Sequence, residues 1–245
     1  MGRGRIVSIL TTLVLPARDI LQATPRTRII TAALGAVPFS FRAGQAVYAG
    51  LADSAVRRPY SIACSPGQAA QMNGIELLVQ IDDHQAPDPH LERATPGTPL
   101  RIEGPFGSFG VPSPMPEDHL LLIAGGTGIA PLRALMWDTL ERHGHVNIVL
   151  IYSARGPEEF AYADELRRLA GQGRITLTLT VTRPGYAPWD GTRGRIDATL
   201  ITAALTTLET RCVVCGPPAL VADATMLLRG AGVVLERIAT ETYAA

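Results

Sequence analysis

The second half of the chain alternates strictly between apolar runs and amphipathic stretches. After residue 118, five apolar runs of β-type are separated by four segments with the 3.6-residue periodicity of helices. The expected strands are 119–126, 146–154, 174–183, 211–216 and 233–238, and the expected helices are 130–144, 157–173, 197–208 and 217–232. This alternation predicts a doubly wound parallel sheet with helices on both faces.

The first half has a different pattern, in which short apolar runs are punctuated by glycine and proline. These runs lie at 5–15, 26–34, 44–51, 60–65, 75–82 and 99–104. They predict an antiparallel β-barrel or sandwich, of which we favour the barrel. Three prolines in "VPSPMPED" (111–118) prevent both a helix and ladder pairing there, which indicates an extended linker. We therefore expect a β-barrel domain over residues 1–113 and an α/β domain over residues 118–245.

Composition excludes several classes of function. The 22 basic and 22 acidic side chains balance, so no basic excess suggests a nucleic-acid partner. All the basic residues are arginine, which excludes Schiff-base lysine chemistry and the lysine-dependent phosphate loop of nucleotide hydrolases. The three cysteines, Cys64, Cys212 and Cys215, are too few for a disulfide framework, and a lone CxxC lacks the second pair that a tetrahedral metal site needs. We expect no metal.

The N-terminus resembles a signal peptide in having a basic start and a short apolar run. However, Thr11 and Thr12 interrupt the run, and no cleavage-site pattern of small residues follows, so a strand is the favoured interpretation. No apolar stretch reaches the ~18 residues of a membrane span. We expect a cytoplasmic protein without a membrane segment.

The stretch "AGGTGIAP" follows the first strand of the second domain, where an open parallel sheet binds its ligands. Gly125, Gly126 and Gly128 can adopt positive φ and leave their amides bare. Thr127 adds a hydroxyl, and Pro131 suits the first turn of a helix whose N–H groups and dipole favour a phosphate. The alternative is an ordinary strand-to-helix turn, although such a turn usually needs one glycine rather than three.

The next strand ends in "YSAR". In a dinucleotide-binding fold, an acidic residue that binds a ribose often lies here, about twenty positions after the glycines. Ser153 and Arg155 occupy that place. A hydroxyl and a guanidinium there can bind a 2′-phosphate, which favours NADPH over NADH. The alternative is that Arg155 is only solvated. Arg193 and Arg195 are further candidates for contact with an adenosine phosphate.

The stretch "RRPYSIACS" places a guanidinium, an aromatic ring and a hydroxyl on one strand. Side chains alternate along a strand, so Arg58 and Tyr60 share a face and Ser61 points to the other. They form either a phosphate clamp with a ring platform or an ordinary barrel strand with one exposed tyrosine. These residues alone do not decide between the two.

In combination, the motifs resemble those of the ferredoxin–NADP⁺ reductase superfamily, over nearly the whole chain and in the same order. They are "GQAV" (44–47), "RPYS" (58–61), "GPFGSF" (104–109), "GGTGIAPL" (125–132), "YSAR" (152–155), "CGPP" (215–218) and the tail "ERIATETY" (236–243). Within the superfamily, the chain is most similar to the NAD(P)H-oxidising reductase components of bacterial multicomponent oxygenases.

The resemblance implies an FAD-binding barrel and an NAD(P)-binding second domain. In the barrel, Arg58 would bind an FAD phosphate, Pro59 would line the same site, Tyr60 would pack against the isoalloxazine ring, and Ser61 would reach flavin N5. In the second domain, the NAD(P)H pyrophosphate would lie on the segment Gly125, Gly126, Thr127, Gly128, Ile129, Ala130 and Pro131. Beside the nicotinamide, the resemblance places Cys215, Gly216 and Pro217, with Glu241 and Tyr243 closing over the site.

Two departures from the family pattern bear on the cofactor and the acceptor. The family's GxxS or GxxT turn, which holds the flavin pyrophosphate, is missing from "QAPDPHLERATPG" (85–97) before Leu91, so this loop grips the phosphates differently or the flavin is FMN. An iron–sulfur cluster requires about four thiolates, more than this chain has. Electrons that leave singly must therefore go to a separate acceptor, such as a ferredoxin or an oxygenase component.

We thus expect an FAD-dependent NAD(P)H oxidoreductase in which Ser61, Cys215 and Glu241 are the catalytic residues. One alternative is an electron-transfer subunit of a larger dehydrogenase or hydrogenase complex. Another is a nucleotide-binding regulatory module that has lost its flavin.

Overall fold

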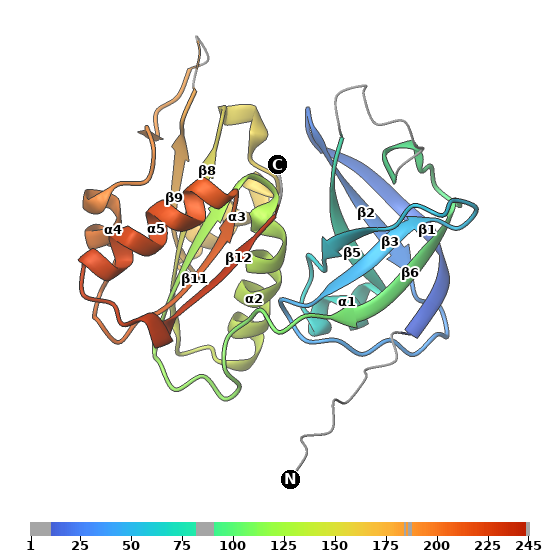
Figure 1. Ribbon diagram of the computed structural model, residues 1–245, viewed down its shortest axis with the longest axis horizontal. Coiled ribbons are helices and arrows are strands. Elements are labelled where there is room, and N and C mark those ends of the chain that lie inside the picture. The colour runs from blue at the N-terminus through green and yellow to red at the C-terminus, as the bar shows by residue number, and fades with distance from the viewer. Residues whose placement is uncertain (1–10, 82–90, 184, 186–187, 244–245) are drawn as a thin grey trace.

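The computed structural model describes residues 11–81, 91–183, 185 and 188–243. Two lobes lie side by side, and each is built on one six-stranded sheet (Figure 1). The first sheet ends with strand β6 (Pro99–Phe106), and the second begins with β7 (His119–Gly125). We propose that the domain boundary lies in the proline-containing segment between them.

The first lobe is an antiparallel barrel with one short helix, α1 (Pro66–Met72). Its other strands are β1 (Thr11–Thr24), β2 (Thr27–Ala33), β3 (Ala46–Leu51), β4 (Arg58–Ser61) and β5 (Gly74–Gln80). The strand order is β4-β3-β6-β1-β2-β5, and an isolated bridge between Ile62 and Leu77 nearly closes the sheet. Fully buried side chains such as Ile30, Val47 and Leu100 fill the interior. The predicted barrel is confirmed.

The second lobe is a parallel sheet whose two faces are both covered by helices. Its further strands are β8 (Asn147–Ala154), β9 (Thr176–Val181), β10 (Thr192–Arg193), β11 (Arg211–Gly216) and β12 (Ile238–Thr242), in the order β10-β9-β8-β7-β11-β12. The helices α2 (Ile129–Arg142) and α3 (Ala163–Gly171) cover one face, and α4 (Ala198–Ala204) and α5 (Pro218–Gly230) cover the other. Alternate β7 residues enter opposite cores: Leu120 and Leu122 face α2, while Leu121 and Ile123 face α5. The predicted doubly wound fold is confirmed.

Several elements differ from the sequence prediction, which includes neither helix α1 nor strand β10. The expected helix 157–173 is split into a 3₁₀ turn, η3 (Pro157–Glu159), and helix α3, because Tyr162 between them has a left-handed φ of 60°. Half of the expected strand 233–238 is a 3₁₀ turn (Leu235–Arg237), and the strand follows it as β12. Pairing with β11 decides this shift, since Cys212 pairs with Ile238 and Gly216 with Thr242.

The topological switch point of the parallel sheet lies between β7 and β11. Strand β7 pairs with β8 on one side and β11 on the other, and the chain leaves β7 and β11 toward opposite faces. A doubly wound sheet opens a crevice at such a point, beyond the carboxyl ends of its strands. The helix that leaves β7, α2, lies between the parallel sheet and the barrel, so this crevice faces the domain interface (Figure 1).

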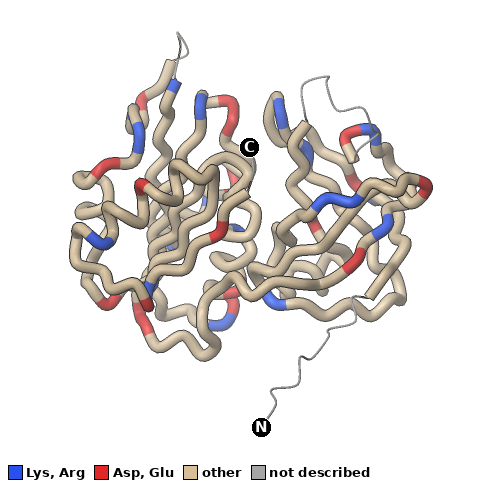
Figure 2. The backbone as a smooth tube through the Cα atoms, in the orientation of Figure 1, with Lys and Arg blue, Asp and Glu red and all other residues tan. Residues whose placement is uncertain are grey.

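The charged residues are interspersed over both lobes (Figure 2). None of the helices in the described segments is both long enough and apolar enough to cross a bilayer.

Candidate functional site

Three residues predicted to be catalytic meet at the junction of the two lobes. Strand β12 runs beside β11, and its register places Glu241 opposite Cys215. The Oε2 atom of Glu241 accepts a hydrogen bond from Ser61 Oγ at 3.5 Å and a weaker one from Cys215 Sγ at 4.0 Å. Ser61 comes from β4 of the barrel, so one carboxylate oxygen joins both domains.

The environment of this cluster favours the protonated forms of its two acidic groups, Glu241 and Cys215. Burial raises the pKa of the Glu241 carboxyl, and the hydrogen bond from Ser61 partly opposes this shift. Burial and the nearby Glu241 charge raise the pKa of the Cys215 thiol well above its usual value. Cys215 is therefore a neutral thiol at neutral pH rather than a thiolate nucleophile.

Replacing Glu241 with glutamine is expected to raise stability at neutral pH, with the gain vanishing in acid. Because its pKa is raised, the folded state holds the Glu241 proton more tightly than the unfolded chain does. Ionising Glu241 therefore costs more free energy in the folded state than in the unfolded chain. This destabilisation is absent below the ordinary pKa of 4.5, grows as the pH rises toward the folded pKa, and stays constant above it. Thermal unfolding of both proteins at several pH values measures this. A difference in Tm that does not vary with pH would contradict the expectation.

The glycine turn has a different role from the one predicted for it. Of the three glycines, only Gly126 has a positive φ, at 54°, whereas Gly125 has φ −127° and Gly128 φ −60°. A Cβ on Gly128 would lie 2.3 Å from the carbonyl oxygen of Cys215, and one on Gly125 would lie 2.6 Å from Leu220 Cδ1. Gly128 thus allows the turn to lie against the end of β11, and Gly125 allows Leu220 of α5 to pack against the end of β7. The expectation of positive φ at both glycines is wrong.

Tyr243 occupies part of the same turn. Its hydroxyl donates to the carbonyl oxygen of Gly125 and accepts from the N–H of Gly128 at 3.2 Å. Burial raises the pKa of Tyr243, so the hydroxyl keeps its proton. The amide of Gly128 is therefore already hydrogen-bonded rather than bare, which corrects a second expectation for this loop.

The start of helix α2 exposes little side chain to a ligand. Residues Gly126–Gly128 form a 3₁₀ turn that leads directly into α2. Ile129, Ala130 and Pro131, all predicted to bind a cofactor, are buried in the core between α2 and the sheet. Ile129, Ala130 and Pro131 therefore offer no side chain to a ligand, and Pro131 has no N–H to offer either.

Beyond the turn, a cavity of about 340 Å³ opens at the carboxyl edge of the sheet. The predicted residues that line it are Gly125, Gly126, Thr127, Ser153, Arg155, Pro217 and Tyr243. The cavity also has four arginines, Arg26, Arg155, Arg183 and Arg195, against two acidic residues, Glu159 and Asp223. This cationic lining, beside a left-handed glycine, suits a ligand with several phosphates.

Sequence reasoning missed the barrel's contribution to this cavity. The hairpin between β1 and β2 reaches across the interface with Thr24, Arg26 and Thr27, and Arg26 forms an ion pair with Glu159. No local signal marked these residues, because they face the cavity only through the packing of the two domains. Of the two later arginines, Arg195 lines the cavity, while Arg193 donates to the carbonyl oxygen of Trp189 at 2.8 Å.

The flavin-binding residues predicted in the barrel lie on β4, the terminal strand of its sheet. Arg58, Tyr60 and Ser61 are half-buried and Pro59 is exposed. Tyr60 packs partly against the barrel core. The divergent phosphate loop before Leu91 lies largely outside the described residues. On this strand, a half-buried ring lies next in sequence to a hydroxyl that donates to Glu241. Such a pair is suited to binding a flat heterocycle.

Comparison with known proteins identifies relatives of the chain. A family profile described as the oxidoreductase NAD-binding domain matches residues 122–225. The ferredoxin–NADP reductase B of Sorangium cellulosum is 35% identical over 167 residues, which are 65% of each protein. The chain belongs to the ferredoxin–NADP⁺ reductase superfamily.

Other members of the superfamily align over more of the chain. The terephthalate 1,2-dioxygenase reductase component 1 of Comamonas is 29% identical over 209 residues, covering 83% of this chain and 60% of that protein. The crystal structure of an Amycolatopsis cytochrome P450 reductase superposes with a TM-score of 0.83 at 25% identity, over 99% of this chain and 73% of that one. The chain thus spans less than two thirds of the length of both the Sorangium and the Comamonas relatives. The superfamily prediction is confirmed.

Proposed function

We propose that this protein is an FAD-dependent NAD(P)H oxidoreductase that passes electrons to a separate acceptor. The observation that carries the proposal is the meeting of Ser61, Cys215 and Glu241, from both domains, next to a cationic cavity at the sheet's switch point. When bound together, the two cofactors supply hydride transfer from nicotinamide to flavin and the later release of single electrons. The chain's own contribution is to bind and orient the rings.

On the barrel side, we assign the flavin to β4. Arg58 would hold a phosphate, Pro59 would line the site, and Tyr60 would support one face of the ring system. Ser61 would offer its hydroxyl to the ring edge that receives the hydride. The Ser61 hydroxyl is now bonded to Glu241, so this carboxylate sets the direction of the Ser61 O–H.

On the other side, we assign NAD(P)H to the cavity beyond β7 and β8. The Gly125–Pro131 segment would support the pyrophosphate through its backbone, and Cys215, Gly216 and Pro217 would border the nicotinamide. Ser153 and Arg155 both line the cavity, and Arg183 and Arg195 add positive charge there. This favours NADPH, because its 2′-phosphate needs such partners.

The acceptor would be a ferredoxin, an oxygenase component or another redox protein. All three cysteines of the chain are buried, and each has its thiol pKa raised by burial, so they are poorly placed to hold an iron–sulfur cluster. Relatives named as reductase components of oxygenase systems support a separate partner.

The test is anaerobic reduction of the purified protein after reconstitution with FAD. We expect about one flavin per chain, bleaching on addition of NADPH, and slower bleaching at equal, low concentrations of NADH. FMN in place of FAD serves as the cofactor control. A protein that retains neither flavin after reconstitution would support the regulatory-module alternative and refute this proposal. Equal rates with both coenzymes would remove only the NADPH preference.

A further inference from the structure

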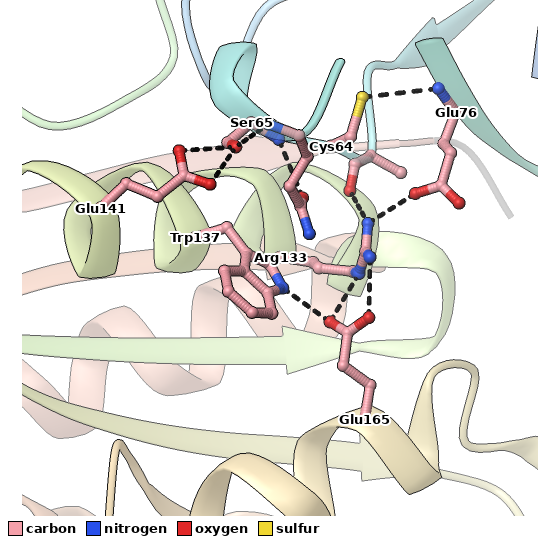
Figure 3. Close-up of polar contacts among 9 residues, drawn as sticks. Cys64, Ser65, Glu76, Arg133, Trp137, Glu141 and Glu165 are labelled. Atoms are coloured by element: carbon pink, nitrogen blue, oxygen red, sulfur yellow. Dashed lines mark hydrogen bonds and ion pairs between the residues drawn. The ribbon is translucent and has the colours of Figure 1, made fainter. Parts of the chain in front are cut away.

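A single buried arginine joins the two domains behind the proposed site. Arg133 projects from α2 and is 4% exposed. Figure 3 shows its guanidinium between Glu76 of the barrel and Glu165 of the α/β domain. The proposed function assigns no role to these residues.

On the barrel side, Arg133 binds the segment that continues from the flavin strand. Its Nη1 donates to the carbonyl oxygen of Ala63 at 2.6 Å and to Glu76 Oε2 at 2.7 Å. Ala63 is two residues beyond Ser61, and its N–H donates to the carbonyl oxygen of Glu76 at 2.8 Å. One guanidinium nitrogen is therefore tied to two neighbouring points of the barrel.

On the α/β side, contacts within the domain that carries Arg133 hold the guanidinium in one orientation. Its Nε and Nη2 donate to the two oxygens of Glu165 at 2.8 and 2.7 Å, and Trp137 Nε1 donates to the same carboxylate at 2.7 Å. The ring of Tyr162 lies 4.3 Å from the guanidinium carbon. Tyr162 is the residue whose left-handed φ interrupts the predicted helix, and this conformation, rare for a tyrosine, accompanies the contact.

The same helix connects Arg133 to the nicotinamide side. Gly128, which packs against the backbone of Cys215, precedes Arg133 by five residues, and α2 begins directly after it. A helix is stiff over so short a length, at about 1.5 Å per residue. A continuous path therefore runs from Ser61 through Ala63 and Arg133 to Gly128 and Cys215.

We propose that Arg133 is a positioning residue that sets the distance and tilt between the flavin and nicotinamide subsites. This inference rests on the proposed function. Hydride transfer requires the reacting atoms to be about 3 to 3.5 Å apart, and a misplacement of about 1 Å from a remote change can lower the rate about 100-fold. A contact that locks the two halves of the site together controls this spacing without touching either ring.

The experiment uses two variants that weaken the barrel contact and keep a cation beside Glu165. Glu76→Met removes one carboxylate and leaves Arg133 paired with Glu165. Arg133→Lys keeps the positive charge but cannot form the forked bond to Glu165 and also reach Ala63 and Glu76. Glu117→Gln is the control, because it weakens another buried ion pair, which joins Glu117 of the interdomain segment to Arg211 of β11 at 2.6 Å. Anaerobic stopped-flow measures flavin reduction in FAD-saturated protein at increasing NADPH.

We expect flavin reduction at saturating NADPH to be about 10- to 100-fold slower in both variants. The dissociation constant for NADPH should change by less than about threefold. The long-wavelength charge-transfer absorbance of the stacked rings should weaken in parallel. Glu117→Gln should lower Tm while keeping the wild-type rate and absorbance. Wild-type rates and absorbance in both variants, or losses matched by Glu117→Gln, would overturn the positioning role alone. A wild-type protein that neither coenzyme reduces would overturn the proposed function and this inference together.

Discussion

Replacing Gly128 with alanine is expected to slow flavin reduction by NADPH about 100-fold and to lower the free energy of unfolding by about 1 to 3 kcal/mol. The added Cβ would lie 2.3 Å from the carbonyl oxygen of Cys215, 2.6 Å from its carbonyl carbon and 2.9 Å from the N of Gly216. All three are backbone atoms, which no rotamer change can move away. The turn after β7 must therefore separate from the end of β11, and the nicotinamide side of the proposed site separates with it.

The expected loss of unfolding free energy comes entirely from tertiary contacts. Gly128 has a φ of −60°, which alanine adopts freely, so local backbone strain contributes nothing. Gly144→Ala is the matched control, because a Cβ there meets no atom within 4 Å, and we expect a change within about 0.5 kcal/mol. Urea denaturation and anaerobic stopped-flow measure both effects. A Gly128→Ala protein with wild-type stability and rate would show that the turn after β7 does not approach the end of β11 as described.

Replacing Arg133 with methionine is expected to lower the free energy of unfolding by about 3 to 5 kcal/mol. The substitution leaves Glu76 and Glu165, with side chains only 15% and 20% exposed, facing each other without the cation that both now bind. Burial and like-charge repulsion both penalise the two carboxylates. This loss is a large fraction of the 5 to 15 kcal/mol that stabilises a typical domain.

The control for this prediction is Arg142→Met on the same helix. Arg142 pairs with Asp138 at 3.0 Å, but its side chain is 55% exposed, so we expect a change within about 0.5 kcal/mol. Adding Glu76→Gln and Glu165→Gln to Arg133→Met removes the uncompensated charges and should recover a large part of the loss. If Arg133→Met is no less stable than Arg142→Met, the buried ion network does not hold the domains together.

The fold could be predicted because both of its patterns are local. Short apolar runs separated by glycine and proline identified the barrel, and the regular alternation of strands and helices identified the parallel sheet. The prediction failed where a distant contact decides the conformation. Tyr162 leaves the helical region beside Arg133, which is 29 residues earlier in the chain. The last strand shifts toward the C-terminus because its pairing with β11 selects residues 238–242.

The sequence proposed residues for the candidate site but did not predict how they contact one another. The motifs named Ser61, Cys215, Glu241 and Tyr243, and the fold brings the first three to one carboxylate oxygen. They did not indicate that Tyr243 would bond to the glycine turn, or that Arg26 would reach the cavity from the barrel. Such contacts join residues more than 100 positions apart, and no local periodicity records them.

By itself, the sequence determined the two domain types, the order of the motifs and the residue types available for chemistry. These follow from side-chain periodicity and backbone preferences, which act over a few neighbouring residues. Only the tertiary structure decided which glycine is left-handed, which glycines are needed for close packing, and that Arg133 ties the flavin strand to the glycine turn. Those outcomes depend on how closely two separately folded surfaces approach, and that distance is set by the packing of the whole interface.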